Sequence, residues 1–168
     1  MKTGMEIDQG WFRQVLGHFP TGVVIVTAMS DDKPAGLSVG SFLSVSLDPQ
    51  LVAVLPAKTS TSWPKIAAAS SFCINVLHES HQDLCRRFAI SGGDKFAGVP
   101  WHPAPSGAPI LDGALVWIDC EHERSIDAGD HLIALGRVRV LDVSASGDAA
   151  PLIFFQGGYG TFIGTGLR

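Results

Sequence analysis

Residues 36–55 read GLSVGSFLSVSLDPQLVAVL. From residue 36 to residue 47, apolar residues alternate with small or polar ones, which is the period of a β-strand with two different faces. One face carries Leu37, Val39, Ser41 and Leu43, and the other carries Ser38, Gly40, Phe42 and Ser44. Asp48 and Pro49 are turn residues that end this strand, and a further strand is expected over 51–55.

Other strand signals lie on both sides of this stretch. Residues 22–28 and 72–77 are rich in β-branched or apolar residues, and 152–156 forms a last short run. Two long strands, 114–126 and 131–143, flank the hairpin signal at 127–130. Because the strands often follow one another directly, the pattern predicts a mainly β fold, an antiparallel β-barrel with short helices, rather than a doubly wound sheet.

Three short helices are expected around this barrel. The first covers residues 8–18, with Asp8 as its cap, and the second covers 63–70. The third runs through Phe88 and begins at Ser80-His81-Gln82-Asp83, which resembles a capping box. Residues 91–109, rich in glycine and proline, are expected to be a loop, and the tail is glycine-rich.

Composition limits the classes of function. The 168 residues fit a single domain, 1–168, with its core over about 11–162. Only 17% of residues are charged while 46% are hydrophobic, which predicts a surface covered by another chain. The net charge of -4 and the lack of a basic run argue against nucleic acid and anionic membranes as partners. Cys73, Cys85 and Cys120 are expected to be reduced and buried, and no apolar run is long enough to span a membrane, so a cytoplasmic protein is expected.

Two groups of small polar residues are unusual in this sequence. The stretch 57–66, AKTSTSWPKI, places four hydroxyl residues and Lys58 before a predicted helix. One helix needs a single cap, so the surplus is explained either by a phosphate site or by a redundant, solvated turn. The second group, Ser38, Gly40, Ser41, Ser44 and Ser46, lies in the strand 36–47. It indicates either a flat ligand lying against the backbone or the exposed face of a half-solvated strand.

Several other motifs lack the context that their chemistry needs. The glycines at 160–166 are not followed by the helix of a dinucleotide fingerprint. His78, His81 and Cys85 do not have the spacing of a metal site with a second ligand cluster, so no metal is expected. The sequence has no GxSxG nucleophile elbow, which disfavours a hydrolytic triad.

Seven segments in order resemble the flavin reductase-like family, the short NAD(P)H:flavin oxidoreductases that supply reduced flavin to two-component monooxygenases. The segments are FPTGVVIVT at 19–27, GLSVGSFLSVSLDPQLV at 36–52, KTSTSW at 58–63, FCINVL at 72–77, DKFAGVPW at 94–101, GDH at 129–131 and GGYG at 157–160. Each segment alone is weak, but the ordered set is specific. The resemblance covers about residues 11–162.

The resemblance implies an FMN-binding split barrel, a homodimer with flavin near the subunit interface, and a transient flavin-dependent monooxygenase as partner. It implies FMN or FAD as cofactor, reduced by NADH or NADPH, with no catalytic side chain because the hydride passes directly between cofactors.

By resemblance, the flavin ring is expected to lie along one set of residues: Ser38, Val39, Gly40 and Ser41. Backbone groups expected to contact polar atoms of the ring belong to Ser44, Val45, Ser46 and Leu47. The phosphate and ribityl chain are expected at Ser60, Thr61 and Ser62. Residues expected beside the phosphate or the ring are Arg87, Lys95 and Phe96. The nicotinamide side is expected to include His131 and Tyr159.

The chain departs from the family pattern at Gly40, where many members have Asn, and at Gln50, where a second proline is usual. The first departure removes a side-chain hydrogen bond, so contacts to the ring there must come from backbone or water. Two other functions use the same barrel. One is a non-catalytic flavin-binding electron carrier or sensor, and the other is an enzyme that retains its flavin and oxidises a small substrate.

Overall fold

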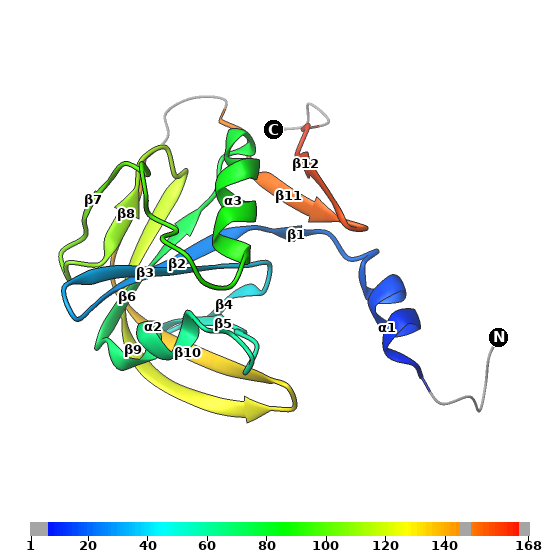
Figure 1. The fold of residues 1–168 in the computed structure, drawn as a ribbon, viewed down its shortest axis with the longest axis horizontal. Coiled ribbons are helices and arrows are strands. Elements are labelled where there is room, and N and C mark those ends of the chain that lie inside the picture. The colour runs from blue at the N-terminus through cyan, green and yellow to red at the C-terminus, as the bar shows by residue number, and fades with distance from the viewer. Residues whose placement is uncertain (1–6, 145–148, 165–168) are drawn as a thin grey trace.

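The computed structural model describes residues 7–144 and 149–164, so the first six residues and Gly166 of the tail lie outside the described part. Seven strands form one antiparallel sheet in the order β3-β2-β6-β9-β10-β5-β4, which curls into a barrel (Figure 1). Their bounds are β2 Val24–Ser30, β3 Lys33–Val39, β4 Phe42–Leu47, β5 Gln50–Val54, β6 Ser71–Val76, β9 Val116–Ala128 and β10 His131–Val143. The mainly β barrel expected from the sequence is therefore confirmed.

The barrel surrounds a core that the alternating strands supply. Val26, Phe72 and Ile74 are fully buried there, together with Trp63 and Ile66 from the helix α2 (Trp63–Ala68). Burial of an aliphatic or aromatic side chain of this kind contributes about 1.5–3 kcal/mol each. The long hairpin β9–β10, with the turn at Gly129 and Asp130, was predicted at nearly the right boundaries.

The prediction of one strand over 36–47 is wrong. The chain forms two strands there, and β3 and β4 are the two opposite edges of the seven-stranded sheet. Gly40 and Ser41 join them, so the continuous period-two pattern conceals a crossing from one edge to the other. Ser41 Oγ donates to the Leu55 carbonyl and accepts from the Leu55 N–H, both at 3.2 Å, which ties the crossing to the end of β5.

The capping box predicted at Ser80–Asp83 is also wrong. A 3₁₀ turn, η1 Glu79–His81, precedes the helix α3 Gln82–Ala89, and His78 caps that turn by accepting from the Ser80 N–H at 3.1 Å. The Ser80 hydroxyl bonds the His78 ring at 2.8 Å rather than the first turn of α3. The helix α3 packs on the barrel through Phe88, which is fully buried.

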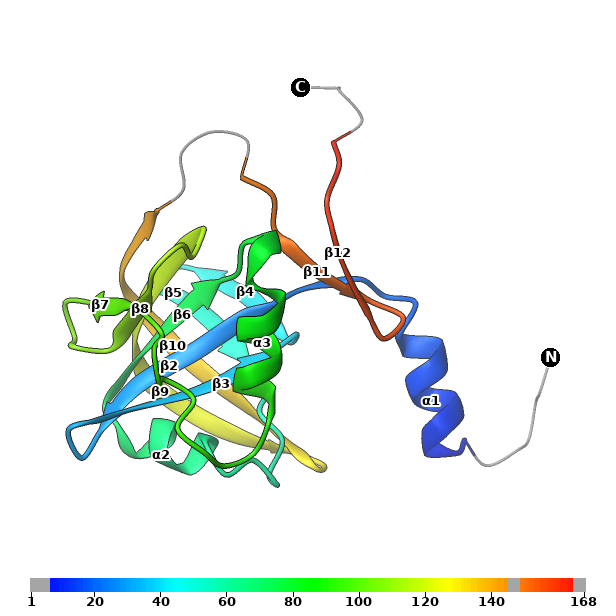
Figure 2. The ribbon, with the colours of Figure 1, turned by 45° about the horizontal axis from the view of Figure 1, so that its top comes forward.

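A second part of the fold stands beside the barrel. The helix α1 Gln9–Leu16 begins at Asp8, whose carboxylate accepts from the Trp11 N–H at 2.8 Å, as predicted. None of its residues is buried, and it projects away from the barrel in both ribbon views (Figures 1 and 2). A three-stranded sheet, β1 Thr21–Gly22, β11 Leu152–Phe155 and β12 Gly158–Thr161, connects α1 to the barrel.

The segment 91–109, which was expected to be a loop, contains short strands, and so does the glycine-rich tail. β12 lies in the glycine-rich tail, and β7 Trp101–Pro103 pairs with β8 Pro109–Leu111. Buried polar side chains hold β8 against the barrel, since Thr27 donates to the Pro109 carbonyl at 2.5 Å and Asn75 accepts from the Leu111 N–H at 2.8 Å. Across the described residues, every helix is too short or too polar to cross a membrane.

Candidate active site

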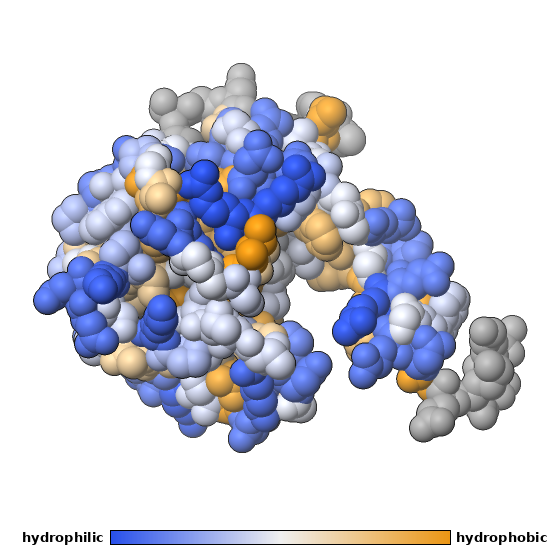
Figure 3. Space-filling model, viewed as in Figure 1, coloured by the Kyte–Doolittle hydropathy of each residue, from blue (hydrophilic) through white to orange (hydrophobic). Residues whose placement is uncertain are grey.

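A cleft of about 570 Å³ opens between the barrel and the end of α1. The space-filling view shows the molecule hollowed between these two parts (Figure 3). The barrel wall of the cleft contains the end of β3, Ala57, residues 59–62 and His131. The opposite wall contains Leu16, Gly17, Phe19, Thr21 and Phe154. This volume lies within the range of pockets that hold small molecules, roughly 300–1,000 Å³.

The end of β3 forms one side of the cleft. Ser38, Val39, Gly40 and Ser41 all line it, so these four residues predicted along a flat ring are brought together. The Ser38 hydroxyl lies 3.5 Å from Cys85 Sγ, and Ser41 is held by its two bonds to Leu55. Leu37 and Leu55 add apolar surface to this wall. The arrangement suits a flat, mostly apolar molecule with polar atoms at its edge.

The hydroxyl corner, Thr59 to Ser62, forms the end of the cleft nearest α2 and has a clear division of roles. Ser60 Oγ accepts from the backbone N–H groups of Ser62 and Trp63, at 3.3 and 3.1 Å, and therefore caps α2. Ser62 occupies the cap position but makes no cap bond with its side chain. Thr59 and Thr61 line the cleft, and within the described residues their hydroxyls make no hydrogen bond. The surplus hydroxyls are thus not redundant caps.

Lys95 brings a positive charge to this corner. Its ammonium donates to the Phe88 carbonyl and Ser62 Oγ at 2.9 Å and to the Gly36 carbonyl at 3.3 Å. The side chain is almost fully buried yet belongs to the wall of the cleft. Burial, and then the charge of Lys65, lower the pKa of the Lys95 ammonium. These three acceptors use all three N–H groups of the ammonium, and no carboxylate of the described structure pairs with it, so Lys95 would act on a bound anion through its charge.

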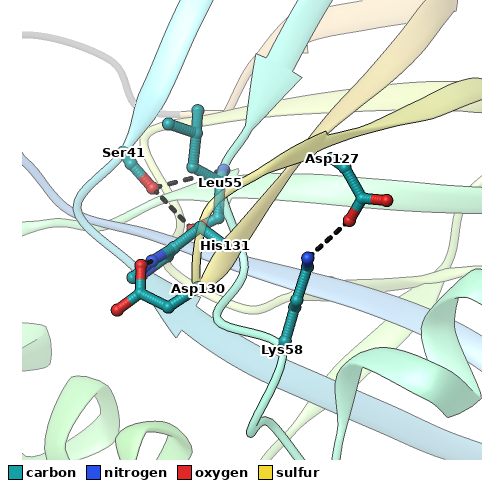
Figure 4. Close-up of polar contacts among 6 residues, drawn as sticks. All are labelled: Ser41, Leu55, Lys58, Asp127, Asp130 and His131. Carbon is teal, nitrogen blue, oxygen red and sulfur yellow. Dashed lines mark hydrogen bonds and ion pairs between the residues drawn. The ribbon is translucent and has the colours of Figure 1, made fainter.

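Lys58 does not have the role that the sequence suggested. Its side chain is not part of the cleft wall and pairs with Asp127 of the β9–β10 hairpin at 2.5 Å (Figure 4). The Lys58 N–H also donates to the Asp130 carbonyl. The lysine next to the hydroxyls in sequence therefore joins the corner to the hairpin, while the lysine that faces the corner comes from 33 residues beyond Ser62.

His131 begins β10 and reaches the cleft beside this hairpin. Its Nδ1 lies 2.7 Å from the Asp130 carboxylate (Figure 4). The bond to His131, followed by the charge of that ring, lowers the pKa of Asp130. A carboxylate can only accept, so Nδ1 carries the proton that faces Asp130, which makes Nε2 the acceptor in the neutral tautomer.

The comparisons with known proteins agree with this geometry. The sequence model of the Flavin reductase like domain matches residues 16–162. The chain belongs to the flavin reductase-like family. A flavin reductase of Pseudomonas putida is 51% identical over 157 residues, covering 93% of this chain and 91% of that protein. The reductase subunit of a flavin-dependent monooxygenase of Rhodococcus jostii is 47% identical and covers 91% of this chain and 77% of that protein.

Solved structures of flavin reductase-like proteins share the fold. Component B of a nitrilotriacetate monooxygenase from Mycobacterium thermoresistibile has a TM-score of 0.89 at 43% identity, covering 93% of this chain and 87% of that chain. The NADH:FAD oxidoreductase of Streptomyces globisporus, in complex with NAD and FAD fragments, has a TM-score of 0.87 at 32% identity. The match covers 96% of this chain and 99% of that chain. The split barrel expected from the resemblance is confirmed.

Not every residue expected at the flavin-reductase site lies at the cleft. Four of them lie within β4, at the edge of the sheet, and are absent from the lining of the cleft: Ser44, Val45, Ser46 and Leu47. Arg87 is exposed and donates to the Ala97 carbonyl at 2.9 Å. Phe96 is buried against Phe88 and lines a second cavity of about 250 Å³. Tyr159, on β12, bonds Cys85 Sγ at 3.2 Å and packs edge to face on Phe154, with ring centroids 5.3 Å apart, but it is absent from the lining of the cleft. Roles for these residues in flavin or nicotinamide binding stay predictions.

Sequence patterns missed several residues that line the cleft. Thr21, Phe19 and Phe154 come from the small sheet and its connection to α1. The motif FPTGVVIVT includes two of them, but nothing in its periodicity indicates that they face a cleft. Pairing of Thr21 with Phe154 across β1 and β11 brings them together.

Proposed function

We propose that the protein uses NADH or NADPH to reduce FMN or FAD in this cleft and delivers the reduced flavin to a partner monooxygenase. The cleft carries the proposal, because it combines an apolar wall with a corner of free hydroxyls and a buried ammonium. A flavin has the matching parts, a flat ring and a phosphorylated chain. Relatives named as flavin reductases and reductase subunits support the activity. The chain is an NAD(P)H:flavin oxidoreductase.

The hydroxyl corner would hold the phosphate end of the flavin. Thr59 and Thr61 are free to donate, and Lys95 supplies the charge. Ser62 keeps the Lys95 ammonium in position, and Ser60 keeps the α2 backbone in position. Since charge-assisted hydrogen bonds are worth about 1.5–3 kcal/mol each, this corner can supply much of the affinity for a phosphorylated flavin.

The β3 end would hold the ring. Bound flavin supplies a ring that accepts a hydride from the nicotinamide. Val39 and Leu37 offer apolar contact, while the missing side chain of Gly40 allows close approach to the backbone. The acceptor nitrogen of His131 would orient a donor group of the nicotinamide nucleotide. No proton transfer is assigned to His131.

The proposed assembly is a homodimer. The edge strand β4 exposes Leu43, Val45 and Leu47, and the last of these is 85% exposed. Helix α1 exposes a row of apolar side chains that the described part of this chain leaves uncovered, among them Phe12 and Val15. Exposed edges and patches of this kind are commonly covered by association. Sedimentation velocity tests this directly: a single monomeric species at micromolar concentration would contradict it.

A cytoplasmic location is part of the proposal. Cys73, Cys85 and Cys120 are free and buried, a state that a reducing compartment preserves.

Anaerobic stopped-flow mixing of protein and flavin with NADH, and separately with NADPH, tests the function. The proposal predicts rapid loss of the oxidised-flavin absorbance and steady turnover that saturates with added flavin. A yellow protein with negligible turnover would instead indicate the electron carrier or sensor. Stoichiometric flavin that is reduced only by another small substrate would indicate the flavin-retaining enzyme.

A further inference from the structure

Gly40 and Thr21 are neighbours in the wall of the cleft. Gly40 lies at the crossing between β3 and β4, and Thr21 lies on β1 of the small sheet. A Cβ atom built on Gly40 would lie 3.0 Å from Thr21 Oγ1, with its next neighbours, Gly22 O and Thr21 Cβ, at 3.9 Å. Both residues line the cleft. The Thr21 hydroxyl thus borders the space that a side chain at position 40 would enter.

The Thr21 hydroxyl has no structural task that explains its place. Within the described part of the chain it makes no hydrogen bond, although the residue is partly buried. Its backbone is fixed by pairing with Phe154, which lines the same cleft. A hydroxyl held at such a wall without a partner can either donate to or accept from a bound molecule.

We propose that Thr21 contacts the flavin, hydrogen bonding a polar atom at the edge of its ring, and that glycine at position 40 is what allows this. The inference rests on the proposed function, because it takes the flavin ring to lie along β3. An alanine Cβ at position 40 would press on Oγ1 at a distance tighter than most Cβ contacts. Rotation about χ1 of Thr21 would relieve that contact and turn the hydroxyl away from the ring.

Flavin affinity of three variants, measured by fluorescence titration with FMN and with riboflavin, tests the proposal. Thr21→Val keeps the shape and removes the hydroxyl, so both flavins should bind about fivefold more weakly, the value of one hydrogen bond. Thr21→Ser keeps the hydroxyl and should stay within about twofold of the wild type. Gly40→Ala should weaken binding by about the same factor as Thr21→Val. In the double variant the two losses should not multiply, because both remove the same contact.

Two further measurements separate failure of this inference from other failures. Thermal unfolding of Thr21→Val should match the wild type, since no hydrogen bond within the described structure is lost. Thr61→Val, at the hydroxyl corner, should weaken FMN binding but leave riboflavin unchanged. If Thr61→Val has this effect while Thr21→Val binds both flavins like the wild type, the inference about Thr21 is wrong and the flavin site stands. If neither variant alters binding, the flavin is not in this cleft and both proposals fail.

Discussion

Replacing Gly36 with alanine would disrupt the contact between β3 and α3. A Cβ atom at Gly36 would lie 2.3 and 2.6 Å from Cε1 and Cδ1 of Phe88, and 3.3 Å from Cε2 of Phe96. Carbon atoms in optimal contact are about 3.5–4.0 Å apart, so the Phe88 ring would have to move by roughly 1 Å or more. Phe88 is fully buried and stacks edge to face on Phe96, with centroids 5.0 Å apart, so the ring has little room to move.

Overpacking of this kind lowers the free energy of unfolding by about 1–3 kcal/mol. The two short contacts place the loss for Gly36→Ala near the upper end of this range. For a chain of this length, a loss of about 3 kcal/mol lowers the melting temperature by roughly 6–12 °C. The Gly36 and Phe88 carbonyls both accept from Lys95, so displacing the helix also shifts the cation at the cleft. Flavin binding should weaken together with stability.

Urea unfolding of a double-mutant cycle measures this contact. Phe88→Leu alone should destabilise the fold, but in the Gly36→Ala background it should remove the clash and recover at least about 1 kcal/mol relative to additivity. Gly160→Ala is the matched control, because a Cβ there would meet no atom within 4 Å, and it should unfold within about 0.5 kcal/mol of the wild type. Additive losses, or a Gly36→Ala variant as stable as the control, would refute the packing argument.

Three further changes have defined outcomes. Lys95→Met should weaken FMN binding at least about tenfold while riboflavin changes less than about twofold in fluorescence titrations; equal losses for both ligands would contradict a phosphate role. Burial, and then the bond to Cys85, raise the pKa of Tyr159 to about 12 from 10, so the neutral phenol stabilises the fold below pH 10 and this stability is lost as pH rises to about 12. Between pH 10 and about 12, the free energy of unfolding measured with a chemical denaturant should fall less in Tyr159→Phe than in the wild type. The same pH dependence in both proteins would contradict this prediction. Buried Asp119 accepts from the Ser106 N–H and hydroxyl at 2.9 and 2.6 Å. Asp119→Ala should therefore lower the free energy of unfolding, measured in urea, by about 2 kcal/mol, and a loss below about 0.5 kcal/mol would contradict this.

Local sequence patterns predicted most of the barrel because each strand carries its own signal. The hairpin 114–143 combined two long β-rich runs with a turn, and both were found within a few residues. The run 36–47 misled the prediction for a physical reason. A period of two continues unchanged across Gly40, while the chain leaves one sheet edge and joins the other. Which strands pair is decided by long-range contacts that periodicity does not contain.

The site was predictable only in part. The surplus hydroxyls before α2 were open to two interpretations, a phosphate site or a solvated turn, and the structure places them at the cleft. The charge was assigned to Lys58 by proximity in sequence, whereas Lys58 pairs with Asp127 and the buried cation is Lys95. Lys95 was expected only through the family resemblance. Thr21 gave no signal as a cleft residue, because the close approach of its hydroxyl to Gly40 exists only in the folded chain.

A crystal structure of the protein grown with FMN would show where the flavin binds. The flavin ring should lie along residues 38–41 and its phosphate beside Thr59, Thr61 and Lys95. Clear density for FMN at another surface, with the hydroxyl corner in contact only with water, would contradict it.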